Sequence, residues 1–163
     1  MDHPYYSGYG RGQGWRRGKG RSQGRGYGWQ GGRQTSVHRQ SLTPLPPPPR
    51  GAIRVVAPTI DDTGLESIVD RRFGRAPFIT VVDIVDKSPV SVVAVPNPYA
   101  TAPGGGAGRA LVHWILVFRA NILIAPYLGL HASMVLQQSG IRIIPAQPGV
   151  RVIDILRMNG LIV

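Results

Sequence analysis

The order of strand-like runs and two glycine-bearing motifs limits the possible folds of this chain more than any other feature. Residues 53–59 and 78–85 are apolar and rich in β-branched side chains, which predicts two buried strands. Between them lie the acidic pair Asp61-Asp62 and the motif FGRAP at residues 73–77. A glycine cluster, GGGAG at residues 104–108, follows and precedes a helix-like segment. Few α/β topologies accommodate this order.

The rest of the domain continues as alternating apolar runs and turn signals. Residues 86–89 are polar and predict a turn between antiparallel strands. We expect further strands over residues 90–95, 121–125 and 141–146, and helices over residues 108–118, 131–139 and 150–158. Three strands followed by helix, strand, helix, strand and helix predict a mixed sheet with helices on its faces.

The first fifty residues have a different composition from the rest. Eleven of them are glycine, interleaved with Arg, Tyr and Trp, and almost none is aliphatic. Because such a segment buries too little apolar surface to offset its loss of backbone entropy, we expect residues 1–43 to be a disordered tail. The proline run of residues 44–51 predicts a stiff polyproline linker. Residues 52–163 would then form the folded domain.

The tail also carries most of the charge. Nine Lys or Arg residues against the single acid Asp2 give residues 1–50 a net charge of +8 out of +11 for the chain. Arginine with interleaved aromatic rings suits single-stranded nucleic acid, through phosphate attraction and base stacking. A solubilising or partner-docking tail is the alternative interpretation. The candidate nucleic-acid contacts are Arg11, Trp15, Arg16, Arg17, Arg21, Arg25, Tyr27 and Trp29.

Composition excludes several classes of protein. The chain has no cysteine, so it forms no disulfide and supplies no thiolate to a cluster. Its longest apolar run, residues 110–118, is far shorter than the roughly 20 residues needed to cross a bilayer. The N-terminus lacks the apolar stretch of a secretion signal. We therefore expect a soluble cytoplasmic protein without a membrane partner.

The ordered motifs resemble those of the dinitrogenase iron–molybdenum cofactor biosynthesis family. That family includes NifX-like and NafY-like proteins and the C-terminal domain of NifB-type proteins, and the resemblance covers roughly residues 52–160. It implies a ribonuclease H-like three-layer fold. The sheet would have five strands in the order 3-2-1-4-5, with strand 2 antiparallel and helices on both faces.

The predicted topology brings the two motifs toward the carboxyl edge of the sheet, where ligands of α/β folds usually bind. Backbone N–H groups of the glycine cluster would face an anion at a helix start, and two arginines beside a glycine turn could clamp it. The cleft acids would be Asp61 and Asp62. A flexible crossover and a salt bridge from the arginines to Asp70 or Asp61 are the alternatives. The candidate anion-binding or cluster-binding residues are Arg72, Phe73, Gly74, Arg75, Gly104, Gly105, Gly106 and Gly108.

Histidines offer the other candidate ligands. His131 begins a predicted helix near the cleft and is a candidate metal ligand, whereas we expect His113 to be packed in the core. In cofactor-carrying members of the family, a histidine commonly precedes Phe-Gly. This chain has Arg72 there, which removes a ligand and adds a charge.

No arrangement of nucleophile and base stands out, so we expect no enzymatic activity. A two-metal nuclease needs several clustered carboxylates, and the first strand holds Arg54 instead of an acid. The resemblance implies a carrier of an anionic iron–sulfur or iron–molybdenum-type cluster that meets donor and acceptor proteins. A tail-based nucleic-acid module and a partner-docking domain without a ligand are the alternatives.

Overall fold

A computed structural model describes residues 44–163 of the chain. The strands are β1 (Ile53–Thr59), β2 (Phe78–Val85), β3 (Ser88–Pro96), β4 (Ile122–Ala125) and β5 (Arg142–Pro145). The helices are α1 (Ala107–Val117), α2 (Leu130–Gln138) and α3 (Val152–Met158), with a short 3₁₀ helix at Gly64–Glu66. No helix in this part of the chain is long and apolar enough to cross a membrane.

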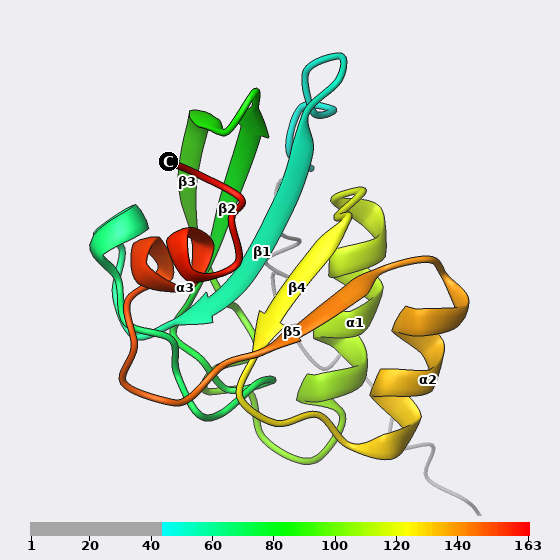
Figure 1. Ribbon diagram of the computed structural model, residues 1–163. Helices are drawn as coiled ribbons and strands as arrows, with labels where there is room; N and C mark the ends of the chain where they lie inside the picture. Colours follow the sequence, from blue (N-terminus) through cyan, green and yellow to red (C-terminus); the bar gives the residue numbers. More distant parts are fainter. Residues whose placement is uncertain (1–43) are drawn as a thin grey trace, which may run out of the picture. The chain divides into compact units, whose positions relative to one another are not determined.

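The strands form one five-stranded sheet in the order β3-β2-β1-β4-β5 (Figure 1). β2 is antiparallel to both of its neighbours, and β4 lies parallel to β1 and β5. The predicted strand order and the antiparallel second strand are therefore confirmed. The turn between β2 and β3 is shorter than predicted, because Asp86 and Lys87 both have positive φ and close a two-residue hairpin. Ser88 and Pro89 consequently belong to β3, whose place at the sheet edge tolerates proline.

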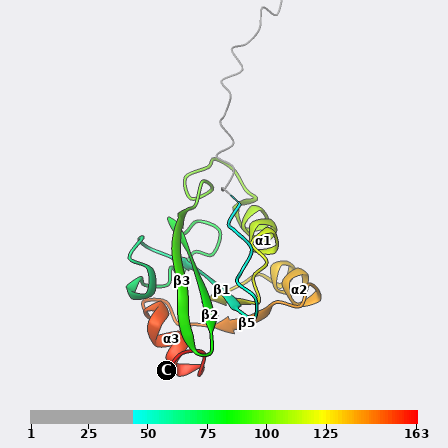
Figure 2. The same cartoon turned by 90° about the horizontal axis from the view of Figure 1, so that it is seen from above.

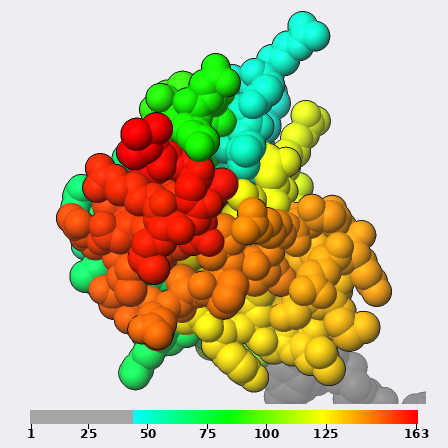
Figure 3. Space-filling model, in the orientation of Figure 1, coloured from blue at the N-terminus to red at the C-terminus, as the bar shows by residue number. Residues whose placement is uncertain are grey.

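Helices cover both faces of the sheet, as predicted. Successive strand residues point to opposite faces, so Val56 packs toward α1 and α2 while its neighbour Val55 packs toward α3. Seen from above, α1 and α2 lie on one side of the strands and α3 lies on the other (Figure 2). In the space-filling view, α3 and the C-terminal residues lie beside β5 and the segment that follows it (Figure 3). Each face thus has its own apolar core.

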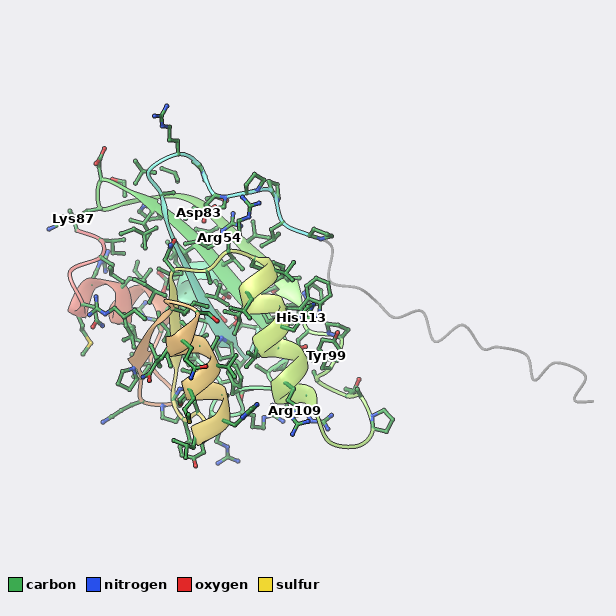
Figure 4. All side chains as sticks on the ribbon, turned by 90° about the vertical axis from the view of Figure 1, so that its right-hand side faces the viewer. Arg54, Asp83, Lys87, Tyr99, Arg109 and His113 are labelled. Atoms are coloured by element: carbon green, nitrogen blue, oxygen red, sulfur yellow. The ribbon has the colours of Figure 1, made fainter. Side chains whose placement is uncertain are left out.

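A buried ion pair joins the central strand, β1, to its neighbour β2. Arg54 Nε and Nη2 donate to the two carboxylate oxygens of Asp83 at 2.7 and 2.8 Å, and Nη1 donates to the Phe118 carbonyl at 2.9 Å. Both side chains are only 4% exposed. Figure 4 shows Arg54 and Asp83 next to each other on the sheet. β1 can hold a buried arginine because the carboxylate of Asp83 lies opposite it on β2 and accepts two hydrogen bonds.

The proline-rich segment before β1 lies against the sheet. Leu45 packs on the core between the sheet and α1. Leu45 and three prolines (Pro46, Pro47 and Pro49) form, together with Arg54 and Asp83, the wall of a cavity of about 190 Å³. The polyproline segment thus contacts the domain beside the buried ion pair.

Candidate functional site

The FGRAP turn and the glycine cluster form one structural unit. A Cβ atom on Gly74 would lie 2.5 Å from the backbone nitrogen of Gly108 and 2.8 Å from the carbonyl carbon of Ala107. Any side chain at Gly74 would therefore collide with the first turn of α1. The Phe73 ring reaches the same turn, since a Cβ on Gly108 would lie 4.0 Å from it. Gly74 does not have a positive φ, so the turn needs glycine there for close approach of the two backbones.

Arg75 holds the loop that leads into α1. Its guanidinium donates to the carbonyl of Tyr99 at 3.2 Å and also to the carbonyls of Ala102 and Gly104. These bonds fix the path of the glycine cluster. The N–H groups of the Arg75 guanidinium are therefore directed at backbone oxygen atoms of the loop. Arg75 positions the glycine cluster.

Asn97 holds the FGRAP turn in place, a role that we did not predict from the sequence. Its side-chain amide donates to the carbonyls of Gly74 at 3.1 Å and Ala76 at 2.8 Å, and its oxygen accepts from the Tyr99 backbone. The residue is buried, and it ties the FGRAP turn to the end of β3. A polar residue between Pro96 and Pro98, directly after an apolar strand, was the available signal.

The glycine cluster presents a run of unused donors at the start of α1. Gly104 and Gly106 have positive φ, and Gly106 caps the helix without a side-chain bond. Within the described residues, no backbone N–H from residue 104 to residue 109 donates to a backbone carbonyl. The first N–H groups of a helix carry its positive dipole end and attract anions. This loop can therefore bind an anion through its backbone.

Arg72 forms an ion pair with Asp70 and also lines a cavity. Its backbone and guanidinium donate to Asp70 at 2.7, 3.2 and 3.0 Å. Burial opposes ionisation of Asp70, but these bonds from Arg72 outweigh it and lower the carboxyl pKa, while the pKa of Arg72 is raised by the same pair. Arg72 is still 58% exposed. It shares a cavity of about 350 Å³ with Arg71 and the loop at Pro148 and Gly149.

Asp61 serves the loop that follows β1. Ser67 donates to its carboxylate at 2.6 Å, and the hydroxyl and backbone N–H of Thr63 donate at 2.6 and 3.2 Å. The bond from Ser67, followed by those from Thr63, lowers the pKa of Asp61. Asp62 is exposed beside it. Neither acid lines the cavity of Arg72, so the structure does not bring the acidic pair and the arginine into one pocket.

Two histidines lie in a groove between α1 and α2 that Arg72 does not line. His113 and His131 line a cavity of about 280 Å³ together with Arg109 and the apolar residues Val112 and Leu116. His131 therefore lines a different cavity from Arg72. The prediction that His113 is packed in the core is wrong, because Leu111, Val112 and Ile115 form the buried face of α1 and His113 is exposed. Figure 4 shows Arg109 and His113 along α1.

The nucleic-acid contacts predicted in the tail and a possible metal site remain to be located. The tail residues proposed to contact nucleic acid, from Arg11 to Trp29, lie outside the residues that the structure describes. Between residues 44 and 163, no three His, Asp or Glu side chains gather in a group that could hold a metal ion.

The fold and the joined motifs define an α/β domain with a five-stranded mixed sheet, and comparison with known proteins gives its family. The profile described as dinitrogenase iron-molybdenum cofactor matches residues 54–158. The chain belongs to that family. A search of curated proteins finds no match.

Solved structures agree with this assignment. The apo form of the orange protein from Desulfovibrio gigas is 27% identical, with a TM-score of 0.57 over 68% of this chain and 90% of that one. PH0822 is 27% identical, with a TM-score of 0.54 over 66% of this chain and 91% of the other. A Thermotoga protein of the DUF35 family is 26% identical, with a TM-score of 0.51 over 66% and 87%.

Proposed function

We propose that this protein binds an anionic metal cluster of the iron–sulfur or iron–molybdenum type and carries it without changing it chemically. Its family is named for the iron–molybdenum cofactor of dinitrogenase, which supports a metal–sulfur cluster as cargo. Proteins that donate or accept such clusters would be its partners.

The observation that carries this proposal is the run of unused backbone donors at residues 104–109. Arg75 holds this loop in place from the FGRAP turn and Asn97 holds the turn itself, so the donors are positioned before any ligand arrives. Pre-positioned N–H groups bind an anion without the entropic cost of ordering a loop. Exposed Arg72 adds positive charge near the same turn.

The residues present suit a carrier that receives its cargo preassembled. The chain lacks cysteine, so the sulfur ligands of a cluster must arrive with it. The carboxylates of Asp61, Asp70 and Asp83 all accept hydrogen bonds from neighbouring protein groups. These acids therefore act in structure, which supports a binding role over acid–base catalysis.

Anaerobic mixing of the full chain with an iron–sulfur cluster donor tests this function, with an Arg72→His variant beside it. We expect the native chain to retain iron and visible absorbance after gel filtration. The variant, which regains an imidazole ligand next to Phe73, should bind at least as well. If the native chain elutes without iron or absorbance, the proposed carriage is wrong, and binding by the variant alone would assign the cargo to relatives that keep the histidine.

A further inference from the structure

The groove between α1 and α2 brings together three nitrogen-bearing side chains from two helices. α1 leads from β3 into β4 and α2 leads from β4 into β5, so both helices begin at the carboxyl edge of the parallel strands (Figure 1). Arg109 and His113 are four residues apart on α1 and therefore lie on one face of it. His131 is the second residue of α2. All three line the same cavity of about 280 Å³.

These three side chains have no hydrogen-bonding or ionic partner in the described part of the protein, although the His113 ring packs edge-on against Trp114. Neither Arg109 nor His113 nor His131 donates or accepts a hydrogen bond there, and none takes part in a salt bridge between residues 44 and 163. The contrast with Arg75, Arg54 and Arg72, which all hold protein oxygen atoms, is clear. The groove side chains are thus available to a ligand.

The remaining wall of the groove is apolar. Val112, Leu116, Ala132 and Val135 complete it, and no carboxylate lines it. A bare divalent cation prefers sites that include carboxylate oxygens, and a guanidinium beside it would repel it. An imidazole nitrogen does bind the softer transition metals, and a guanidinium hydrogen-bonds the anionic groups around them. The groove therefore suits a metal centre that brings its own anionic, polarisable ligands.

We propose that the metal cluster binds in the α1–α2 groove. His113 and His131 supply nitrogen ligands to a metal of the cluster, and the positive charge of Arg109 faces the negative charge of the cluster. This inference rests on the proposed function and adds the residues that perform it. The binding step forms metal–nitrogen bonds and displaces exchangeable ligands from the cluster, without oxidation or reduction. The apolar wall contacts the sulfide surface of the cluster. The groove begins at Arg109, in the same helical turn that holds the last of the unused N–H donors.

The test uses the full chain and a synthetic iron–sulfur cluster carried by small exchangeable thiolates. Native protein is compared with His113→Gln, His131→Gln, the double variant and Arg109→Gln, and His38→Gln in the tail is the matched control. All three groove side chains are exposed, so we expect these variants to fold, which circular dichroism and thermal unfolding would verify. The readouts are retained iron and, after reduction, imidazole-nitrogen coupling in pulsed electron paramagnetic resonance.

We expect nitrogen coupling in the native complex, its reduction in each single histidine variant and its loss in the double variant. Affinity should fall about tenfold or more for each ligand removed, and Arg109→Gln should weaken binding while leaving the coupling. The His38→Gln control should match the native chain. If the native protein and the double variant bind equally and neither shows nitrogen coupling, the cluster does not bind in the groove, although the carrier function would stand.

Two other outcomes would also be decisive. If the native chain takes up no cluster at all, the proposed function and this inference fall together. Cobalt(II) alone, offered in place of the cluster, should not bind tightly. Tight cobalt binding that depends on His113 and His131 would make the groove a site for a bare cation and overturn the proposal.

Discussion

At the scale of single residues, Gly74 is the position where one carbon atom matters most. Its missing Cβ leaves room for the backbone of Gly108 at a distance that no side chain permits. We expect Gly74→Ala to push the FGRAP turn off α1 and to lower the free energy of unfolding by about 1–3 kcal/mol. Gly105→Ala is the control, since its Cβ would meet nothing within 4 Å. Urea unfolding of both variants measures the difference, and equal stability would contradict the close packing.

The buried pair of Arg54 and Asp83 makes a second residue-scale prediction. Removing one partner leaves an unpaired charge in the sheet, so Asp83→Ala should cost about 3–5 kcal/mol. Replacing both by apolar side chains, Arg54→Met with Asp83→Leu, removes the charge and the desolvation cost together. We expect the double variant to recover most of the loss in chemical denaturation. A double variant less stable than Asp83→Ala would show that the pair itself supplies the stability.

Asp70 makes the fold sensitive to acid. Its pKa is lowered in the folded state, so its stabilising effect is full above the ordinary aspartate pKa of about 3.9 and is lost as pH falls through the lower folded pKa. We expect the native melting temperature to drop between pH 5 and about pH 3, and less steeply in Asp70→Asn. Asp62→Asn, at an exposed acid, is the control and should follow the native curve. Identical slopes for native protein and Asp70→Asn would refute the assignment.

At the scale of elements, the proline-rich segment before β1 acts as part of the domain. Leu45 packs against the core under α1 and covers the sheet near Arg54. Leu45 is half-buried, so we expect Leu45→Ala to lower the free energy of unfolding by about 1–2 kcal/mol. Met158→Ala, at a side chain that is 80% exposed, should change stability by less than about 0.5 kcal/mol. Equal effects would mean that the segment does not dock.

Strands and helices with a clear pattern in the sequence could be predicted, and contacts between residues far apart in the sequence could not. β1 and β2 follow from runs of β-branched residues, and their predicted bounds match the structure. The start of β3 was misplaced because two residues with positive φ close its hairpin, and neither Asp86 nor Lys87 is a glycine. The packing of Gly74 on Gly108 and the role of Asn97 depend on contacts between distant segments, which composition and periodicity do not report.

The candidate site shows the same division. The glycine cluster before α1 could be recognised from sequence, because glycines directly before a helix predict an anion-binding loop without reference to distant residues. The burial of His113 was predicted wrongly because its neighbours in the sequence are apolar, although His113 itself lies on the exposed face of α1. The groove that it forms with His131 needs α1 and α2 side by side, an arrangement that only the folded chain reveals.

At the scale of the whole molecule, the proposal treats this protein as a domain that holds a cluster between other proteins, on the basis of its family and of the groove between α1 and α2. A carrier must release what it binds. Its ligands should therefore be few and exchangeable, as two exposed imidazoles and a set of N–H donors would be.

Transfer of an intact cluster tests this account most directly. The full chain, loaded anaerobically and freed of excess reagent, would be mixed with a cysteine-ligated apoferredoxin while visible circular dichroism follows the acceptor. We predict that the ferredoxin signal appears without release of free iron, at a rate that rises with acceptor concentration. A chain that never acquires the cluster, or iron that reaches the acceptor only after the cluster has decomposed, would contradict the account.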